Sequence, residues 1–103
     1  MNVVEMNTTK SKSKNDEAAE ILAFLNKKTG RNYRPVQVNL DFILARLREG
    51  YTAQDCRAVV AMKCREWGAD EKMNKFLRPA TLFNREKFNQ YSGELGEIDG
   101  DVS

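Results

Sequence analysis

Arginines and aromatic residues alternate in two stretches that lie far apart in the sequence. These stretches contribute Arg31, Tyr33 and Arg34 in one case and Arg78, Phe83 and Arg85 in the other. A groove for single-stranded nucleic acid uses this combination, because cations follow the phosphates and aromatic rings stack on the bases. Tyrosine and phenylalanine also fill protein cores, so Tyr33 and Phe83 have an alternative role inside the fold. Nonspecific or single-stranded DNA binding is one hypothesis for this chain.

A second set of residues suggests contact with another protein. Phe42 points away from the apolar stripe of its predicted helix, which also carries Arg46 and Arg48. Either that helix is buried on two sides or Phe42 contacts a partner. Lys63 falls in the middle of an apolar helix face, near Trp67. Either its stem is buried while its ammonium reaches solvent or a carboxylate, or it is a site residue at the mouth of a groove.

The residue types that usually carry catalysis are scarce. The chain has no histidine, and its two cysteines are too few for a four-ligand zinc site. The sequence holds no paired carboxylates, no nucleophile–base pair and no phosphate-binding loop. We therefore expect a protein that is not an enzyme and that uses no cofactor, no metal and no small-molecule substrate.

Cysteine spacing and hydropathy indicate the compartment. Cys56 and Cys64 are eight residues apart in one predicted helix, which separates their Cα atoms by about 12 Å along the helix axis. A disulfide needs less than about 7 Å, so we expect two reduced, buried thiols in a cytoplasmic protein. No apolar run approaches the roughly 20 residues that span a bilayer, so no membrane contact is expected.

Length and charge set the size of the domain and the character of its partners. The 103 residues are 41% hydrophobic and include nine aromatic residues, enough for the core of one small domain. The net charge is +2. Because residues 1–14 contribute +2 and residues 94–103 contribute −4, the segment between them carries +4. This moderate positive charge permits an acidic partner without requiring one.

Helical periodicity dominates the middle of the chain. We predict three main helices over residues 15–28, 37–49 and 53–67, starting at Asn15 as N-cap, and at Thr52 with Asp55 as a capping box. A short helix over residues 70–76 and an amphipathic turn or two around Phe88 follow. The fold class is all-α: a small bundle of three main helices plus short C-terminal helices, without a sheet. Trp67 is expected to be largely buried.

The two ends of the chain differ from its middle. Residues 1–14 are mostly polar and have no periodic spacing of apolar residues, so we predict a disordered segment. Residues 93–103 are acidic and rich in glycine, so we predict a flexible tail. The helical domain then covers residues 15–92.

Both prolines follow an arginine, in Arg34-Pro35 and Arg78-Pro79. The residue before a proline is held in an extended conformation, so each pair predicts a corner between helices. Two roles for the arginines remain open. Each either forks onto a carboxylate or helix-end carbonyls, or stays exposed beside Lys63 as part of one cationic patch.

Four separated motifs in residues 21–88 closely resemble the conserved C-terminal domain of phage and prophage replication proteins, the replisome organiser family. The matching residues are Leu25, Asn26, Lys28, Thr29, Gly30, Tyr33, Arg34 and Pro35, then Arg46 through Thr52, then Lys63, Cys64 and Trp67, and finally Phe76, Leu77, Arg78, Pro79, Thr81, Leu82 and Phe83. The resemblance implies a helical layout similar to primosomal DnaD-like proteins, and contact with helicase-loading machinery or DNA. In that family a DNA-binding segment normally precedes this domain, and residues 1–14 do not resemble one. The chain is then either a fragment or a stand-alone small protein, and the resemblance does not carry origin recognition over to it.

Together these observations predict a non-catalytic accessory domain in the initiation of phage DNA replication, located in the cytoplasm of the bacterial host. It would recruit the helicase or its loader to phage DNA; the alternative is a nonspecific or single-stranded DNA-binding module. The candidate contact residues are Arg31, Tyr33, Arg34, Phe42, Arg46, Lys63, Arg78 and Arg85.

Overall fold

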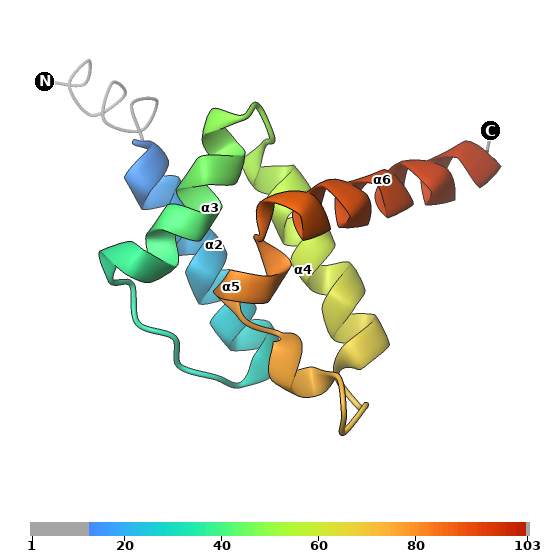
Figure 1. Ribbon diagram of the computed structural model, residues 1–103, viewed down its shortest axis with the longest axis horizontal. Helices are drawn as coiled ribbons and strands as arrows, with labels where there is room; N and C mark the ends of the chain where they lie inside the picture. Colours follow the sequence, from blue (N-terminus) through green and yellow to red (C-terminus); the bar gives the residue numbers. More distant parts are fainter. Residues whose placement is uncertain (1–12, 103) are drawn as a thin grey trace, which may run out of the picture.

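The computed structural model describes residues 13–102, with side chains placed for residues 13–95, and within this part every regular element is helical. The elements are α2 (Lys14–Thr29), α3 (Gln37–Arg48), α4 (Ala53–Trp67), the 3-10 helix η1 (Asn74–Phe76), α5 (Pro79–Leu82) and α6 (Arg85–Val102) (Figure 1). The predicted all-α class is confirmed, and the three main helices lie within a residue of their predicted bounds. None of the described helices is both long enough and apolar enough to cross a membrane.

The ends of the main helices are fixed by side chains close in sequence. The N-cap of α2 is Ser13, whose hydroxyl accepts a hydrogen bond from the Asp16 amide, so the prediction of Asn15 was wrong by two residues. The helix ends at Gly30, which takes the left-handed conformation with φ 72°. At α4 the predicted capping box is confirmed, because Thr52 and Asp55 each accept from the other's amide at 3.0 and 2.9 Å.

The core forms where α2, α3 and α4 meet and where the C-terminal elements cover them. Phe83 and Phe88 are fully buried and stack with ring centroids 5.5 Å apart, while Tyr51 meets Phe88 edge to face at 4.7 Å. Through these rings α6 packs across α3 and α4 (Figure 1). The other buried apolar residues are Ala18, Ile21, Leu22, Leu25, Leu40, Ile43, Leu44, Leu47, Cys56, Val59, Val60, Met62, Leu77, Leu82 and Tyr91.

The second proline corner forms as predicted. Arg78 is extended, with φ −150° and ψ 159°, and Pro79 opens α5. Leu82 and Phe83 then enter the core. Trp67, expected to be largely buried, is only partly buried, because it lies in the last turn of α4 at the edge of the bundle. Phe42 is also partly buried against the core.

The C-terminal third differs from prediction in the lengths of its helices. Only Asn74–Phe76 is helical in the predicted 70–76 segment, because the Asp70 side chain accepts from the amides of Lys72 and Met73 and forms a turn there. Helix α6 starts after Asn84, whose side chain accepts from the Lys87 amide, and continues to Val102. Residues 93–102 were assigned to a tail but are helical here; the flexibility predicted for them stays a prediction. The predicted disorder of residues 1–14 lies outside the described residues except at Ser13, which caps α2, and Lys14, which begins it.

Candidate functional site

Arg31 and Tyr33 tie two connections of the fold together. The backbone amide and carbonyl of Tyr33 bond the side chain of Asn26 at 2.8 and 2.9 Å, and the Tyr33 hydroxyl donates to the Leu77 carbonyl at 3.0 Å. The Arg31 guanidinium donates to the Tyr33 hydroxyl at 3.2 Å and to Asn74 at 3.3 Å. Both side chains are partly buried. Tyr33 is therefore not a free ring for stacking on bases, and Arg31 is not a free cation for phosphates, contrary to what the nucleic-acid hypothesis expected.

Arg34 and Arg78 are exposed, and neither pairs with a carboxylate in the part of the chain that the structure describes. Arg78 donates from Nε to the Thr81 hydroxyl at 3.1 Å, and its guanidinium lies 5.5 Å from the centre of the Phe76 ring. Within the described residues, neither guanidinium forks onto a carboxylate or onto helix-end carbonyls, which was one of the two roles considered for these arginines. Both guanidinium groups stay available at the surface.

Lys63 is buried in α4, with only 4% of its surface exposed. Its ammonium donates to Glu66 at 3.0 Å and to Glu94 of α6 at 3.1 Å, and lies 4.3 Å from the ring centre of Tyr91. Burial lowers the pKa of this lysine, but the hydrogen bonds to the two glutamates outweigh burial and raise the pKa overall. The interpretation as a buried stem with a carboxylate-bound ammonium is correct, and Lys63 does not contribute to an exposed cationic patch.

Arg46 was expected on a contact surface but is 5% exposed. It donates to the Phe83 carbonyl at 3.0 Å and to Glu49 at 3.0 Å, while its Nε has no acceptor among the described residues. It joins the end of α3 to Phe83, the residue that ends α5. The sequence held a signal for this, because position 46 follows Ile43 by three residues on the apolar stripe.

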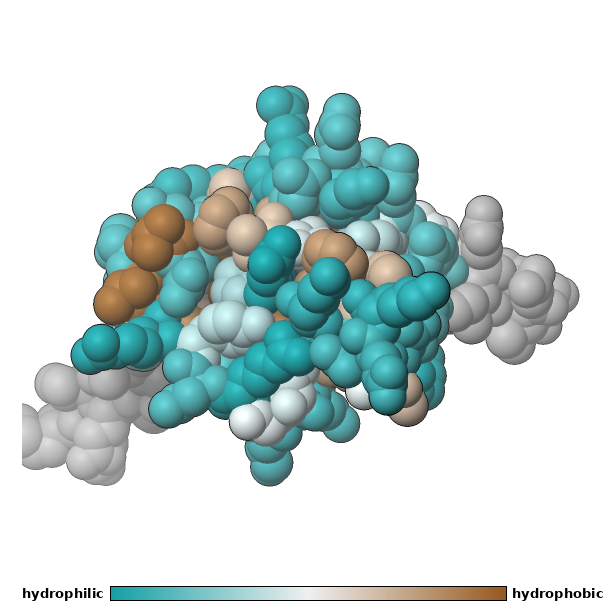
Figure 2. All heavy atoms as spheres, turned by 60° about the horizontal axis from the view of Figure 1, so that its bottom comes forward, coloured by the Kyte–Doolittle hydropathy of each residue, from teal (hydrophilic) through white to brown (hydrophobic). Residues whose placement is uncertain are grey.

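A groove between α3 and the start of α6, here called the α3–α6 groove, brings three of the candidate residues together. It has a volume of about 360 Å³, and its lining residues are Val38, Asp41, Phe42, Ala45, Arg46, Phe83, Asn84 and Arg85. Val38 is 64% exposed, and the Arg85 side chain is 84% exposed at 3.7 Å from Glu49. Figure 2 shows exposed apolar side chains gathered at one edge of the surface; the large exposed apolar residues are Val36 and Val38. Val38 was not among the predicted contact residues, because it precedes the apolar stripe of α3.

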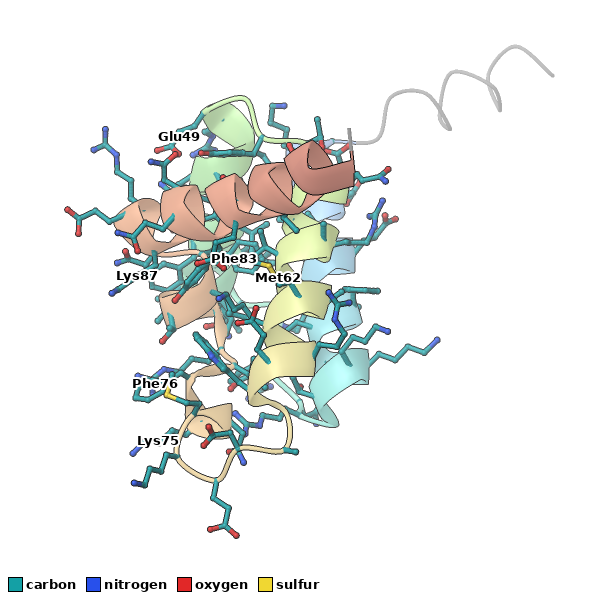
Figure 3. The ribbon with its side chains drawn as sticks, turned by 90° about the vertical axis from the view of Figure 1, so that its right-hand side faces the viewer. Glu49, Met62, Lys75, Phe76, Phe83 and Lys87 are labelled. Carbon is teal, nitrogen blue, oxygen red and sulfur yellow. The ribbon has the colours of Figure 1, made fainter. Side chains whose placement is uncertain are left out.

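A second groove, the α4–α6 groove, has a volume of about 400 Å³. Its lining residues are Trp67, Met73, Phe76, Thr81, Lys87 and Tyr91. Lys87, Phe76 and Lys75 lie along one side of the molecule (Figure 3). Two of the candidate residues adjoin this groove: Arg78 through Phe76 and Thr81, and the buried Lys63 through the rings of Trp67 and Tyr91. No sequence pattern predicted this groove, because its walls come from four segments that share no period.

The described residues hold no cluster of three or more histidine, cysteine, aspartate or glutamate side chains that would bind a metal. Both cysteines are free thiols; Cys56 is buried and Cys64 is partly buried.

Residues 21–93 match the family model described as the conserved phage C-terminus. No curated protein and no solved structure matches the chain. The matched segment runs from within α2 into α6, so it includes all the residues that line the two grooves.

Proposed function

Because the chain belongs to the family of conserved phage C-terminal domains, we propose that it is a non-catalytic accessory domain of phage DNA replication, which recruits the replicative helicase or its loader to phage DNA. The family match supports a phage domain. The link to replication rests on the resemblance of its motifs to the replisome organiser proteins.

The observation that carries the proposal is the composition of the α3–α6 groove. Val38 leaves a large apolar side chain in water beside the half-buried ring of Phe42, and Arg85 adds an exposed guanidinium at the same groove. Protein interfaces combine an apolar centre with a polar rim in this way, and arginine and aromatic residues are enriched in them. The expected partner surface has an apolar residue that covers Val38 and a carboxylate that pairs with Arg85.

The test uses purified helicase and helicase loader from the host, with binding to each measured by biolayer interferometry. We expect Val38→Asp to weaken binding by roughly tenfold or more, because a charge replaces the apolar centre of the contact. Val38 is in the first turn of α3, where a carboxylate interacts favourably with the helix dipole. The variant should therefore remain folded. The matched control is Ala23→Asp on the exposed side of α2, outside both grooves. Equal affinities for the two variants would refute the proposed contact.

Nonspecific DNA binding is the second candidate function, and the exposure of Arg34 and Arg78 favours it. The stacking part of the hypothesis loses support, because Phe83 is fully buried and the Tyr33 hydroxyl is bonded to Leu77. Any binding to DNA should therefore be electrostatic, and its affinity should fall steeply as the salt concentration rises. A double variant with Arg34→Ala and Arg78→Ala should flatten the salt dependence of oligothymidylate binding. No binding at low salt would exclude this candidate for the domain.

A further inference from the structure

The α4–α6 groove is separate from the groove assigned above to the helicase or its loader. Lys87 and Tyr91 line it from α6, one turn apart, whereas Arg85 of the same helix lines the α3–α6 groove. Residues two positions apart on a helix point to nearly opposite sides. The two grooves therefore lie on opposite sides of α6, and a ligand in one does not occupy the other.

Three cations surround the α4–α6 groove. Lys87 lines it, and the charged groups of Lys75 and Arg78 lie 5.4 and 5.5 Å from the centre of the Phe76 ring. None of the lining residues is acidic, and in the described part of the chain none of the three cations forms an ion pair. By contrast, Lys63 and Arg46 already have glutamate partners. Lys75, Arg78 and Lys87, here called the rim cations, are thus complementary to an anionic ligand.

The floor of the groove favours an apolar side chain over a stacked base. Tyr91 is only 8% exposed, and Trp67 meets it edge to face at 5.9 Å. The Lys63 ammonium lies over both of these rings, and two of the rim cations lie over Phe76. Each of these three rings therefore has a cation over it, which leaves less aromatic surface for stacking a nucleobase. What remains is a hollow with Met73 in its wall, a flexible side chain that adapts to apolar groups of different shape.

We propose that the α4–α6 groove binds an acidic segment of a partner protein. A large apolar side chain of that segment enters the hollow beside Met73, and flanking carboxylates pair with the rim cations. The site is a second protein-binding surface and does not depend on the contact proposed for the α3–α6 groove. A domain with both surfaces connects two proteins.

The test uses the full chain and a fluorescein-labelled synthetic peptide in which aspartates flank one phenylalanine, with binding followed by fluorescence anisotropy. Lys87→Glu should weaken binding on the order of tenfold, because it reverses a rim charge. Met73→Ala should weaken it roughly fivefold through lost apolar contact. The matched control is Lys14→Glu, an equal change of charge in the exposed first turn of α2, which should bind as the unaltered chain does. Circular dichroism melting checks that each variant is folded.

Two further probes separate a peptide site from a site for any polyanion. A peptide with serine in place of phenylalanine should bind much more weakly, and oligothymidylate should not displace the phenylalanine peptide at physiological salt. The proposal is overturned if the serine peptide binds equally well, if Lys87→Glu behaves like Lys14→Glu, or if oligothymidylate displaces the peptide. Each of these results leaves the Val38→Asp experiment on helicase and loader binding unaffected.

Discussion

At the scale of single residues, the charged side chains divide into those that hold the fold together and those that remain available. Lys63 and Arg46 are buried and bonded to glutamates, and Arg46 also bonds a backbone carbonyl. Removing one partner of such a buried pair destabilises a protein because the other is left uncompensated. Arg78 and Lys87 are exposed and unpaired among the described residues. Substitutions that test binding should therefore replace Arg78 or Lys87 and leave Lys63 and Arg46 unchanged.

Cys56 gives a residue-scale prediction for pH. Burial, followed by the nearby Asp55 charge, raises the pKa of the Cys56 thiol from 9.0 to about 12. Because the unfolded thiol ionises first, its contribution to the free energy of unfolding is complete below pH 9.0 and is lost as pH rises toward about 12. The loss should be about 1.4 kcal/mol per pH unit in that range. Cys56→Ala has no thiol to ionise. The difference in the free energy of unfolding between the unaltered chain and this variant should therefore shrink as pH rises.

The measurement is urea unfolding of both proteins, with reductant present, from neutral pH to about pH 11. Cys64, Tyr91 and Lys63 also have raised pKa values, and they lower stability in the same direction as pH rises. The difference between the two proteins is therefore the readout. A difference that stays constant across the alkaline range would show that the Cys56 thiol is not protected from ionisation.

At the scale of elements, the extended connection between α2 and α3 is held by side chains. Asn26, in the last turn of α2, bonds both backbone groups of Tyr33, and the Tyr33 hydroxyl reaches the Leu77 carbonyl. Gly30 makes the preceding turn possible, because its φ of 72° is a conformation that other residues seldom adopt. One amide side chain thus positions a connection that has no backbone ladder of its own.

We expect Asn26→Ala to lower the free energy of unfolding by about 2 kcal/mol, because two part-buried backbone groups lose their partners. Asn26→Asp should lie between this variant and the unaltered chain, since it keeps the acceptor for the Tyr33 amide but loses the donor. Asn39→Ala is the control, because its side chain makes a single exposed hydrogen bond to Arg34. Urea unfolding would contradict the prediction if the Asn26 and Asn39 variants lost the same stability.

At the scale of the whole molecule, α6 completes the core and contributes lining residues to both grooves. It packs on α3 and α4 through Phe88, and its two sides contribute Arg85 to one groove and Lys87 to the other. The grooves share no lining residue. If each binds its own partner, the two binding events should be nearly independent in free energy.

Independent binding at the two grooves is measurable, and it is expected only if both grooves bind the partners proposed above. Affinity for the helicase or its loader should change less than about threefold when the aspartate–phenylalanine peptide is present at saturation. The peptide affinity should change by the same small factor in the reciprocal titration. Mutual exclusion in both titrations would mean that the partners share one surface and that two separate binding sites do not exist.

The sequence by itself determined the helices that depend on neighbouring residues. The bounds of α2, α3 and α4 follow from the spacing of apolar residues and from caps such as Thr52 and Gly30, which act within a few positions. The motifs in residues 21–88 also indicated a phage domain, in agreement with the family match over residues 21–93. The sequence determined the lengths of the C-terminal helices less well. Asp70 forms a turn in place of a helix, and α6 continues past its predicted end.

Only the tertiary structure decided which cations are buried and where the grooves lie. Lys63 bonds Glu94 across 31 residues, Arg46 bonds Phe83 across 37, and Tyr33 bonds Leu77 across 44. Local periodicity places a residue on one face of its helix, but it does not say which distant segment covers that face. Burial and pairing depend on that covering segment, because a charge leaves water only where a partner compensates it. For this reason the sequence placed Arg46 and Lys63 among the candidate contact residues. The contacts with Phe83 and with Glu94 of α6 made these two internal, while Val38 and Lys87 stayed at the surface.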